Sequence, residues 1–309
     1  MWAPQKVGES VQPKTNTEAA QARQAIKKQL VKEQRALMVR KFLTNKLAML
    51  GAIMTLAVIL FALLAPVLAP QGPLEMSVFD RLTAPSMDGY IFGTDNLGRS
   101  VFARVIYGAR VSLVIGASVG LLSMILGSIL GLYASYYRAL DNVIMRICDG
   151  LSAIPSTLLA IALMAMLEPS VTNLVISLTV VNVPRVARIA RSSAVVVREQ
   201  TYIEAMRALG ASSTRIIWGH IAPNIISPVV VQSSYIFANA IITEAALSFL
   251  GVGVPLPSPS WGNILYEGKA VIQKAWWMIV YPGVFTAVTV LGLNIFGDGL
   301  RDLLDPQTK

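Results

Sequence analysis

Six apolar segments constrain what this chain can fold into more than any other feature of its sequence. They occupy residues 47–69, 111–134, 151–167, 171–183, 225–254 and 276–297. Because a helix needs about 20 apolar residues to cross a bilayer, the first, second and last segments each predict one membrane span. The charged content of 14 % agrees with this, since soluble proteins average about 25 %. We therefore expect an all-α, polytopic membrane protein.

The remaining segments predict three further spans. The third and fourth are short and are separated only by residues 168–170, so they predict two helices joined by a tight turn. We expect the fourth helix to continue through Pro184 toward Arg198. Segment 225–254 is longer than one span and contains Gly251, so its last part predicts a loop outside the bilayer. The chain should then have six transmembrane helices.

Lysine and arginine positions predict the orientation. Most of the 26 basic residues precede residue 47, lie between the second and third spans, or follow residue 183, among them Arg185. Because cytoplasmic loops retain basic residues, both termini should be cytoplasmic. This divides the chain into a basic tail, a six-helix domain with an extracytoplasmic loop at about 70–110, and a C-terminal tail; the three parts cover residues 1–46, 47–298 and 299–309. The topology accounts for the net charge of +9 without a nucleic-acid partner.

The tail before the first span predicts a basic amphipathic helix over residues 18–41, lying on membrane lipid. Elsewhere the chain lacks the sequence signs of catalysis. There is no phosphate-binding G-x-x-x-x-G-K-[ST] motif, so any ATP that drives the protein binds another subunit. A single histidine, His220, and a single cysteine, Cys148, cannot form the usual multi-ligand metal site. We predict no catalytic residue, metal or cofactor in this chain.

Glu244 is the acidic residue that lies well inside an apolar segment. Ionisable residues in spans are costly and face the bundle interior or an aqueous cavity. Two interpretations stay open: a carboxylate bonded to a neighbour such as Thr243 or Ser248, or a residue of a translocation pathway.

Residues 199–223 lie between two apolar segments and form the most informative polar stretch. A run of helix formers is interrupted by Gly210 and bounded by Pro223, which predicts two short helices at an angle. An amphipathic helix in the membrane interface would fit the same composition. Substitution of Gly210 distinguishes the two, because an interfacial helix gains about 1 kcal/mol from Gly→Ala, whereas a bend with positive φ is damaged.

Four separated motifs resemble those of C-type permease subunits of dipeptide, oligopeptide and nickel ABC importers. They cover residues 92–113, 204–223, 247–263 and 297–306. The resemblance implies a type I ABC importer permease fold in a bacterial cytoplasmic (inner) membrane. It also implies a B-type sister permease, two ATPase subunits that bind ATP and Mg, an extracytoplasmic substrate-binding protein, and alternating access. Alternatives are import of nickel or another small solute by the same machine, and ion-coupled secondary transport.

The resemblance also assigns residues. Contacts with the ATPase would come from a coupling loop at 199–223, through Glu204, Ala205, Arg207, Gly210, Arg215, Ile216, His220 and Pro223. The loop departs from the family pattern at Met206, where alanine is frequent, and at Ala222, where leucine is usual. Docking of the binding protein is assigned to Asp95, Arg99 and Trp261, with packing inside the chain as the alternative.

Overall fold

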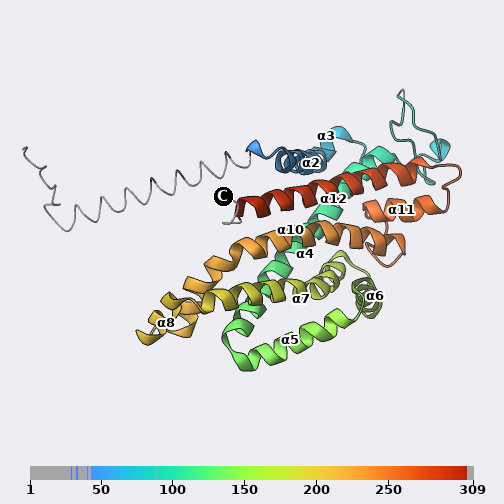
Figure 1. The fold of residues 1–309 in the computed structure, drawn as a ribbon. Helices are drawn as coiled ribbons and strands as arrows, with labels where there is room; N and C mark the ends of the chain where they lie inside the picture. Colours follow the sequence, from blue (N-terminus) through green and yellow to red (C-terminus); the bar gives the residue numbers. More distant parts are fainter. Residues whose placement is uncertain (1–28, 30–32, 34–39, 41–42, 88, 305–309) are drawn as a thin grey trace, which may run out of the picture. The chain divides into compact units, whose positions relative to one another are not determined.

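The computed structural model describes residues 29, 33, 40, 43–87 and 89–304 (Figure 1). The chain divides into two compact units, Met1–Asn45 and Lys46–Lys309. In the first unit the described residues up to Thr44 are helical, and the Gln29 side chain donates a hydrogen bond to Glu33 at 3.2 Å. Most of the predicted helix over residues 18–41 lies outside the described residues.

The second unit is built from helices, and no strand occurs in its described part, which confirms the all-α prediction. A 3₁₀ turn spans Val78–Asp80, and a π-helical turn spans Ile217–Ile221. The α-helices are α2 (Lys46–Leu63), α3 (Ala65–Leu68), α4 (Val101–Tyr136), α5 (Arg138–Ala153), α6 (Ser156–Met166), α7 (Val171–Arg198), α8 (Thr201–Ala208), α9 (Ser213–Ile216), α10 (Ala222–Phe249), α11 (Trp261–Lys269) and α12 (Trp277–Leu304).

Five helices of the described chain are long and apolar enough to cross a membrane, and α5 and α6 together can form a sixth span. The five are α2, α4, α7, α12 and the helix Ser213–Phe249, which includes α10. The separate third span expected over residues 151–167 is not found as one helix. Instead α6 has 11 residues, about 16 Å, and meets α5 at a bend of 94°. By contrast α7 runs through Pro184 to Arg198 as predicted.

Three boundaries differ from the sequence predictions. Helix α4 begins at Val101, inside the predicted loop 70–110, because Ser100 caps it by accepting a hydrogen bond from the Ala103 amide. Ser260 caps α11 in the same way by accepting a hydrogen bond from the Asn263 amide, so Trp261, beyond the predicted loop at the end of segment 225–254, opens a helix. Helix α12 continues to Leu304, beyond the predicted domain end at residue 298.

Small residues let the helices of the bundle pack closely. A Cβ atom on Gly127 of α4 would lie 2.5 Å from the Val186 Cβ of α7, and one on Gly131 would lie 2.6 Å from the Ala187 carbonyl oxygen. Such contacts replace the hydrophobic driving force that lipid does not supply. Figure 1 shows α8 and the C-terminal end of α12 at one end of the bundle and α11 at the other. These are called the α8 end and the α11 end below.

Candidate functional site

The segment at the α8 end forms two helical arms around Gly210. Helix α8 stops at Ala208, and Gly210 takes φ +79°, a conformation that side chains with a Cβ rarely adopt. The Gly210 amide donates to the Arg207 carbonyl, and the Ala211 amide donates to the Met206 carbonyl, both at 3.0 Å. These two bonds form a Schellman motif, which closes a helix at a glycine. The predicted bend with positive φ is therefore confirmed.

This segment combines buried anchors with an exposed tip. Ile203 of α8 and Ile216 of α9 are completely buried, as is Ile217 in the π-helical turn. The guanidinium of Arg207 lies 5.1 Å from the centre of the Tyr136 ring at the end of α4. Between these anchors Leu209 is 87 % exposed, next to the exposed Gly210. The structure thus presents a protruding tip whose base is packed into the core.

The eight residues assigned to ATPase coupling are not all on the surface. Six are exposed, namely Glu204, Ala205, Arg207, Gly210, Arg215 and Pro223. His220 is half-buried and Ile216 is buried, so these two side chains are less accessible to a partner than the other six. Their role in coupling stays a prediction.

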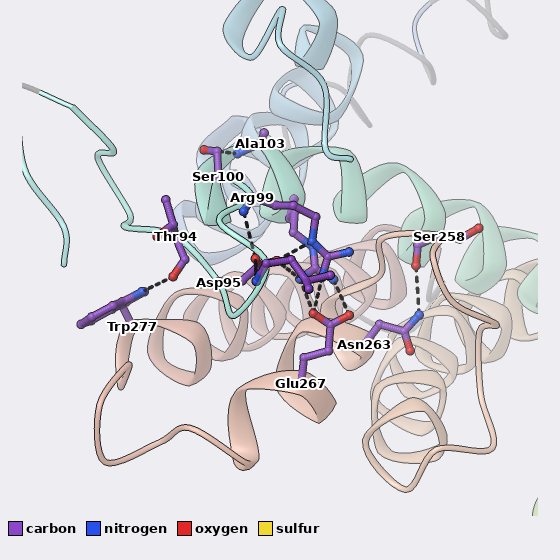
Figure 2. Close-up of polar contacts among 11 residues, drawn as sticks. Thr94, Asp95, Arg99, Ser100, Ala103, Ser258, Asn263, Glu267 and Trp277 are labelled. Carbon is purple, nitrogen blue, oxygen red and sulfur yellow. Dashed lines mark hydrogen bonds and ion pairs between the residues drawn. The ribbon is translucent and has the colours of Figure 1, made fainter. Parts of the chain in front are cut away.

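A buried ion cluster lies at the α11 end (Figure 2). Asp95 of the loop before α4 accepts bonds from Arg99 Nε and from Arg104 Nη1, both at 2.6 Å. Glu267 of α11 accepts bonds from Arg99 Nη2 and Arg104 Nη1, both at 2.5 Å. Asp95 also accepts the amides of Leu97 and Arg99. Two cations and two anions thus fasten the loop to α4 and α11.

Two tryptophans also bond to the backbone of this region. The indole of Trp277 donates to the Thr94 carbonyl at 3.0 Å, as Figure 2 shows, and that of Trp261 donates to the Val105 carbonyl at 3.0 Å. Asp95, Arg99 and Trp261, which were assigned to binding-protein docking, are all buried. In this structure their side chains cannot contact a partner directly, and they affect the surface only by fixing the backbone of the loop before α4 and of the start of α4. The docking role stays a prediction.

Comparisons with known proteins show the family to which the chain belongs. The family model described as "Binding-protein-dependent transport system inner membrane component" matches residues 123–309, and "N-terminal TM domain of oligopeptide transport permease C" matches residues 34–85. The dipeptide transport system permease protein DppC of Alkalihalophilus pseudofirmus is 44 % identical over 86 % of this chain and 87 % of its own length. The chain is a C-type ABC importer permease. The di/tripeptide transport system permease protein DppC of Pseudomonas aeruginosa is 40 % identical over 87 % of this permease and 91 % of its own length.

The fold of the permease is also similar to a solved structure. A chain of the MetNI methionine ABC transporter superposes with a TM-score of 0.56 and 17 % sequence identity. The match covers 65 % of this permease and 96 % of that chain. At this identity the likeness concerns the fold, and it agrees with the type I permease fold predicted from the motifs.

Glu244 of the permease lies in the middle of a serine cluster. Ser112 of α4 donates to its carboxylate at 3.0 Å, and Ser248, one turn along α10, donates at 2.9 Å. Thr243 instead bonds the Asn239 carbonyl. The side chain is fully buried, which fits the interpretation of a bonded carboxylate. A role for Glu244 in the translocation pathway stays a prediction.

Sequence reasoning missed two members of the ion cluster, Arg104 and Glu267. Arg104 follows Arg99 by five positions, and both flank a predicted span, which is the only local signal. Glu267 is distant in the sequence and becomes a partner only when α11 packs against α4. Within the described part of the permease no group of three or more His, Cys, Asp or Glu side chains could hold a metal ion.

Proposed function

We propose that this permease is the translocation subunit of an ATP-driven importer of dipeptides and short oligopeptides. The supporting observation is the identity of 40–44 % with permeases named for dipeptide and di/tripeptide transport, over most of their length. In this proposal the permease pairs with a B-type sister in the cytoplasmic membrane, with both termini cytoplasmic. ATP and Mg²⁺ bind to two separate ATPase subunits, and an extracytoplasmic binding protein delivers the peptide.

The α8 end is the ATPase-facing side of this machine. Exposed Leu209 and Glu204 would enter a cleft of the ATPase, while Ile203 and Ile216 transmit the movement of the tip to the core because they are buried there. The α11 end would face the binding protein, with the ion cluster keeping its loop in one shape. Shifting the ratio of two conformations of the helix bundle from 1:99 to 99:1 requires a ligand whose binding free energies to the two conformations differ by about 5.5 kcal/mol. Nucleotide binding to the partners supplies that free energy.

Co-purification tests the proposed composition. C-terminally tagged permease is extracted from its native membranes in mild detergent, and the bound proteins are identified by mass spectrometry. We expect a second permease, two ATPases and a binding protein, which can then be tested for peptides against nickel. A permease that purifies without an ATPase under several crosslinking conditions would contradict the proposal.

Gly210→Asp tests the coupling loop itself. No heavy atom lies within 4 Å of a Cβ atom at this position, so the substitution does not disturb the core. It does add a charge and a Cβ where φ is +79°. We expect the complex to assemble and peptide uptake into reconstituted vesicles to be lost. Preserved uptake would refute the assignment.

A further inference from the structure

A polar cavity lies among the middle parts of three helices that are long and apolar enough to span a membrane. Its volume is about 240 Å³, and its lining comes from α7, α10 and α12. The polar lining residues are Arg185, Gln232, Tyr235, Asn239 and Asn294, beside Ile236 and Ile242. Polar side chains in the middle part of a membrane span are costly when they face lipid, so they face protein or water instead. This surface must therefore be covered by something other than hydrocarbon.

Arg185 is the most unusual member of this lining. Its place in the sequence predicts a cytoplasmic basic residue, and in the structure it lies halfway along the continuous helix α7. Its side chain is exposed in the isolated permease, and it makes no hydrogen bond or ion pair with any described residue. In contrast, Arg188 and Arg191 of the same helix pair with Asp149 and Asp141. Arg185 is thus an arginine in a helix long and apolar enough to span a membrane, and its side chain has no partner among the described residues.

The amide side chains around Arg185 are also available for a ligand. Gln232, Asn239 and Asn294 are half-buried, and within the described residues their side-chain amides make no hydrogen bond. Tyr235 is held in place, because its hydroxyl donates to Asp298 of α12. Each amide can donate and accept, so together they suit a ligand with repeated N–H and C=O groups.

The cavity continues toward the α8 end. A second cavity of about 500 Å³ shares Gln232 and Tyr235 with it and extends along α10 past Pro228 to Asn224. The two adjoining cavities follow one face of α10 from its middle to its first turn. The second cavity combines apolar residues such as Val231 and Leu304 with polar residues such as Ser227 and Arg301, so a ligand that enters at Arg185 has a partly polar path toward the α8 end.

We propose that Arg185 binds the C-terminal carboxylate of a peptide during translocation, with the amides of Gln232, Asn239 and Asn294 bonding its main chain. This inference rests on the proposed function. All peptides share a main chain and a terminal carboxylate, whatever their side chains. A guanidinium matches a carboxylate with two parallel hydrogen bonds, and the lining of the first cavity contains no acidic side chain that would attract the peptide's ammonium instead. The site thus accepts peptides in general.

The test compares a free peptide with its C-terminal amide. The complete importer, purified with its own binding protein, is reconstituted in liposomes, and ATP-driven uptake of alanyl-alanine and of alanyl-alanine amide is measured. The uptake ratio is determined for the wild type, Arg185→Gln and Arg185→Lys. Any preference of the binding protein for the free acid cancels, because the same binding protein is used throughout. The control is Arg138→Gln, an exposed arginine at the start of α5.

We expect Arg185→Gln to lower the preference for the free acid about tenfold or more, since a hydrogen bond to a charged group is lost. Arg185→Lys should keep part of the preference, and Arg138→Gln should keep all of it. An unchanged ratio in an Arg185→Gln importer that still transports would overturn the inference alone. Loss of the sister permease from this variant on size exclusion would also overturn it, because Arg185 would then pair with that subunit. A wild type that imports no peptide would contradict the proposed function itself.

Discussion

Removing one charge from the ion cluster at the α11 end should destabilise the permease strongly. The change is Glu267→Gln, which keeps the shape of the side chain but removes its negative charge. Glu267 accepts bonds from Arg99 Nη2 and Arg104 Nη1 at 2.5 Å and from Arg104 Nη2 at 3.0 Å. After the change two buried guanidinium groups share the single carboxylate of Asp95, so the cluster carries a net positive charge.

The expected cost follows from the burial of the partners. The side chains of Arg99 and Arg104 are 3 % and 0 % exposed, so water cannot replace the lost carboxylate. Removing one partner of a buried ion pair costs about 3–5 kcal/mol. The matched control is Asp149→Asn, which breaks an exposed pair with Arg188 and should cost less than about 1 kcal/mol.

Thermal unfolding of the purified permease in detergent measures the difference. At about 2–4 °C per kcal/mol we expect Glu267→Gln to lower Tm by about 6–20 °C and Asp149→Asn by less than about 4 °C. Adding Arg99→Gln to Glu267→Gln makes the cluster neutral again and should recover part of the loss. Equal Tm values for the two single variants would refute the reasoning, because the cluster would then be solvated rather than buried.

Three further outcomes are expected. Gly98→Ala should abolish folding, because its Cβ would lie 1.7 Å from the Ser77 carbonyl oxygen, and an expression assay detects this. Gly210→Ala should cost only about 1–2 kcal/mol of stability and should lower peptide uptake, which a transport assay measures. In unfolding assays Glu244→Leu should cost about 1–3 kcal/mol, because the hydroxyl groups of Ser112 and Ser248 lose the acceptor to which they donate, and Glu244→Gln should cost less. Burial and a hydrogen bond to the Asp80 carboxylate raise the pKa of Tyr90. Its contribution to stability is therefore complete below about pH 10 and is lost as the pH rises above that value. Tyr90→Phe should make Tm depend less on pH above about pH 10.

The helices that cross the membrane were largely predictable from the sequence. Long apolar segments reveal spans directly, and the predicted continuation of α7 through Pro184 toward Arg198 is found. Gly210 could also be assigned, since a glycine between helix formers signals a reversal of φ. These features depend on residues that are close in the sequence.

The contacts between distant segments were not predictable. Nothing in the sequence pairs Arg104 with Glu267, because that contact depends on how α11 packs against α4. The surroundings of Arg185 were not predictable for a related reason. Basic residues after an apolar run predict the cytoplasmic side, whereas the cavity that Arg185 lines forms only where α7, α10 and α12 meet.

The π-helical turn at Ile217–Ile221 has a mechanical consequence. It joins the second arm of the loop to α10 without a break, so that Ser213–Phe249 forms one helix of 37 residues. At 1.5 Å per residue this rod is about 55 Å long. A tilt of about 10° around its centre would displace each end by about 5 Å, in opposite directions. A displacement of the arm beside Gly210 would thus move the other end of this helix in the opposite direction.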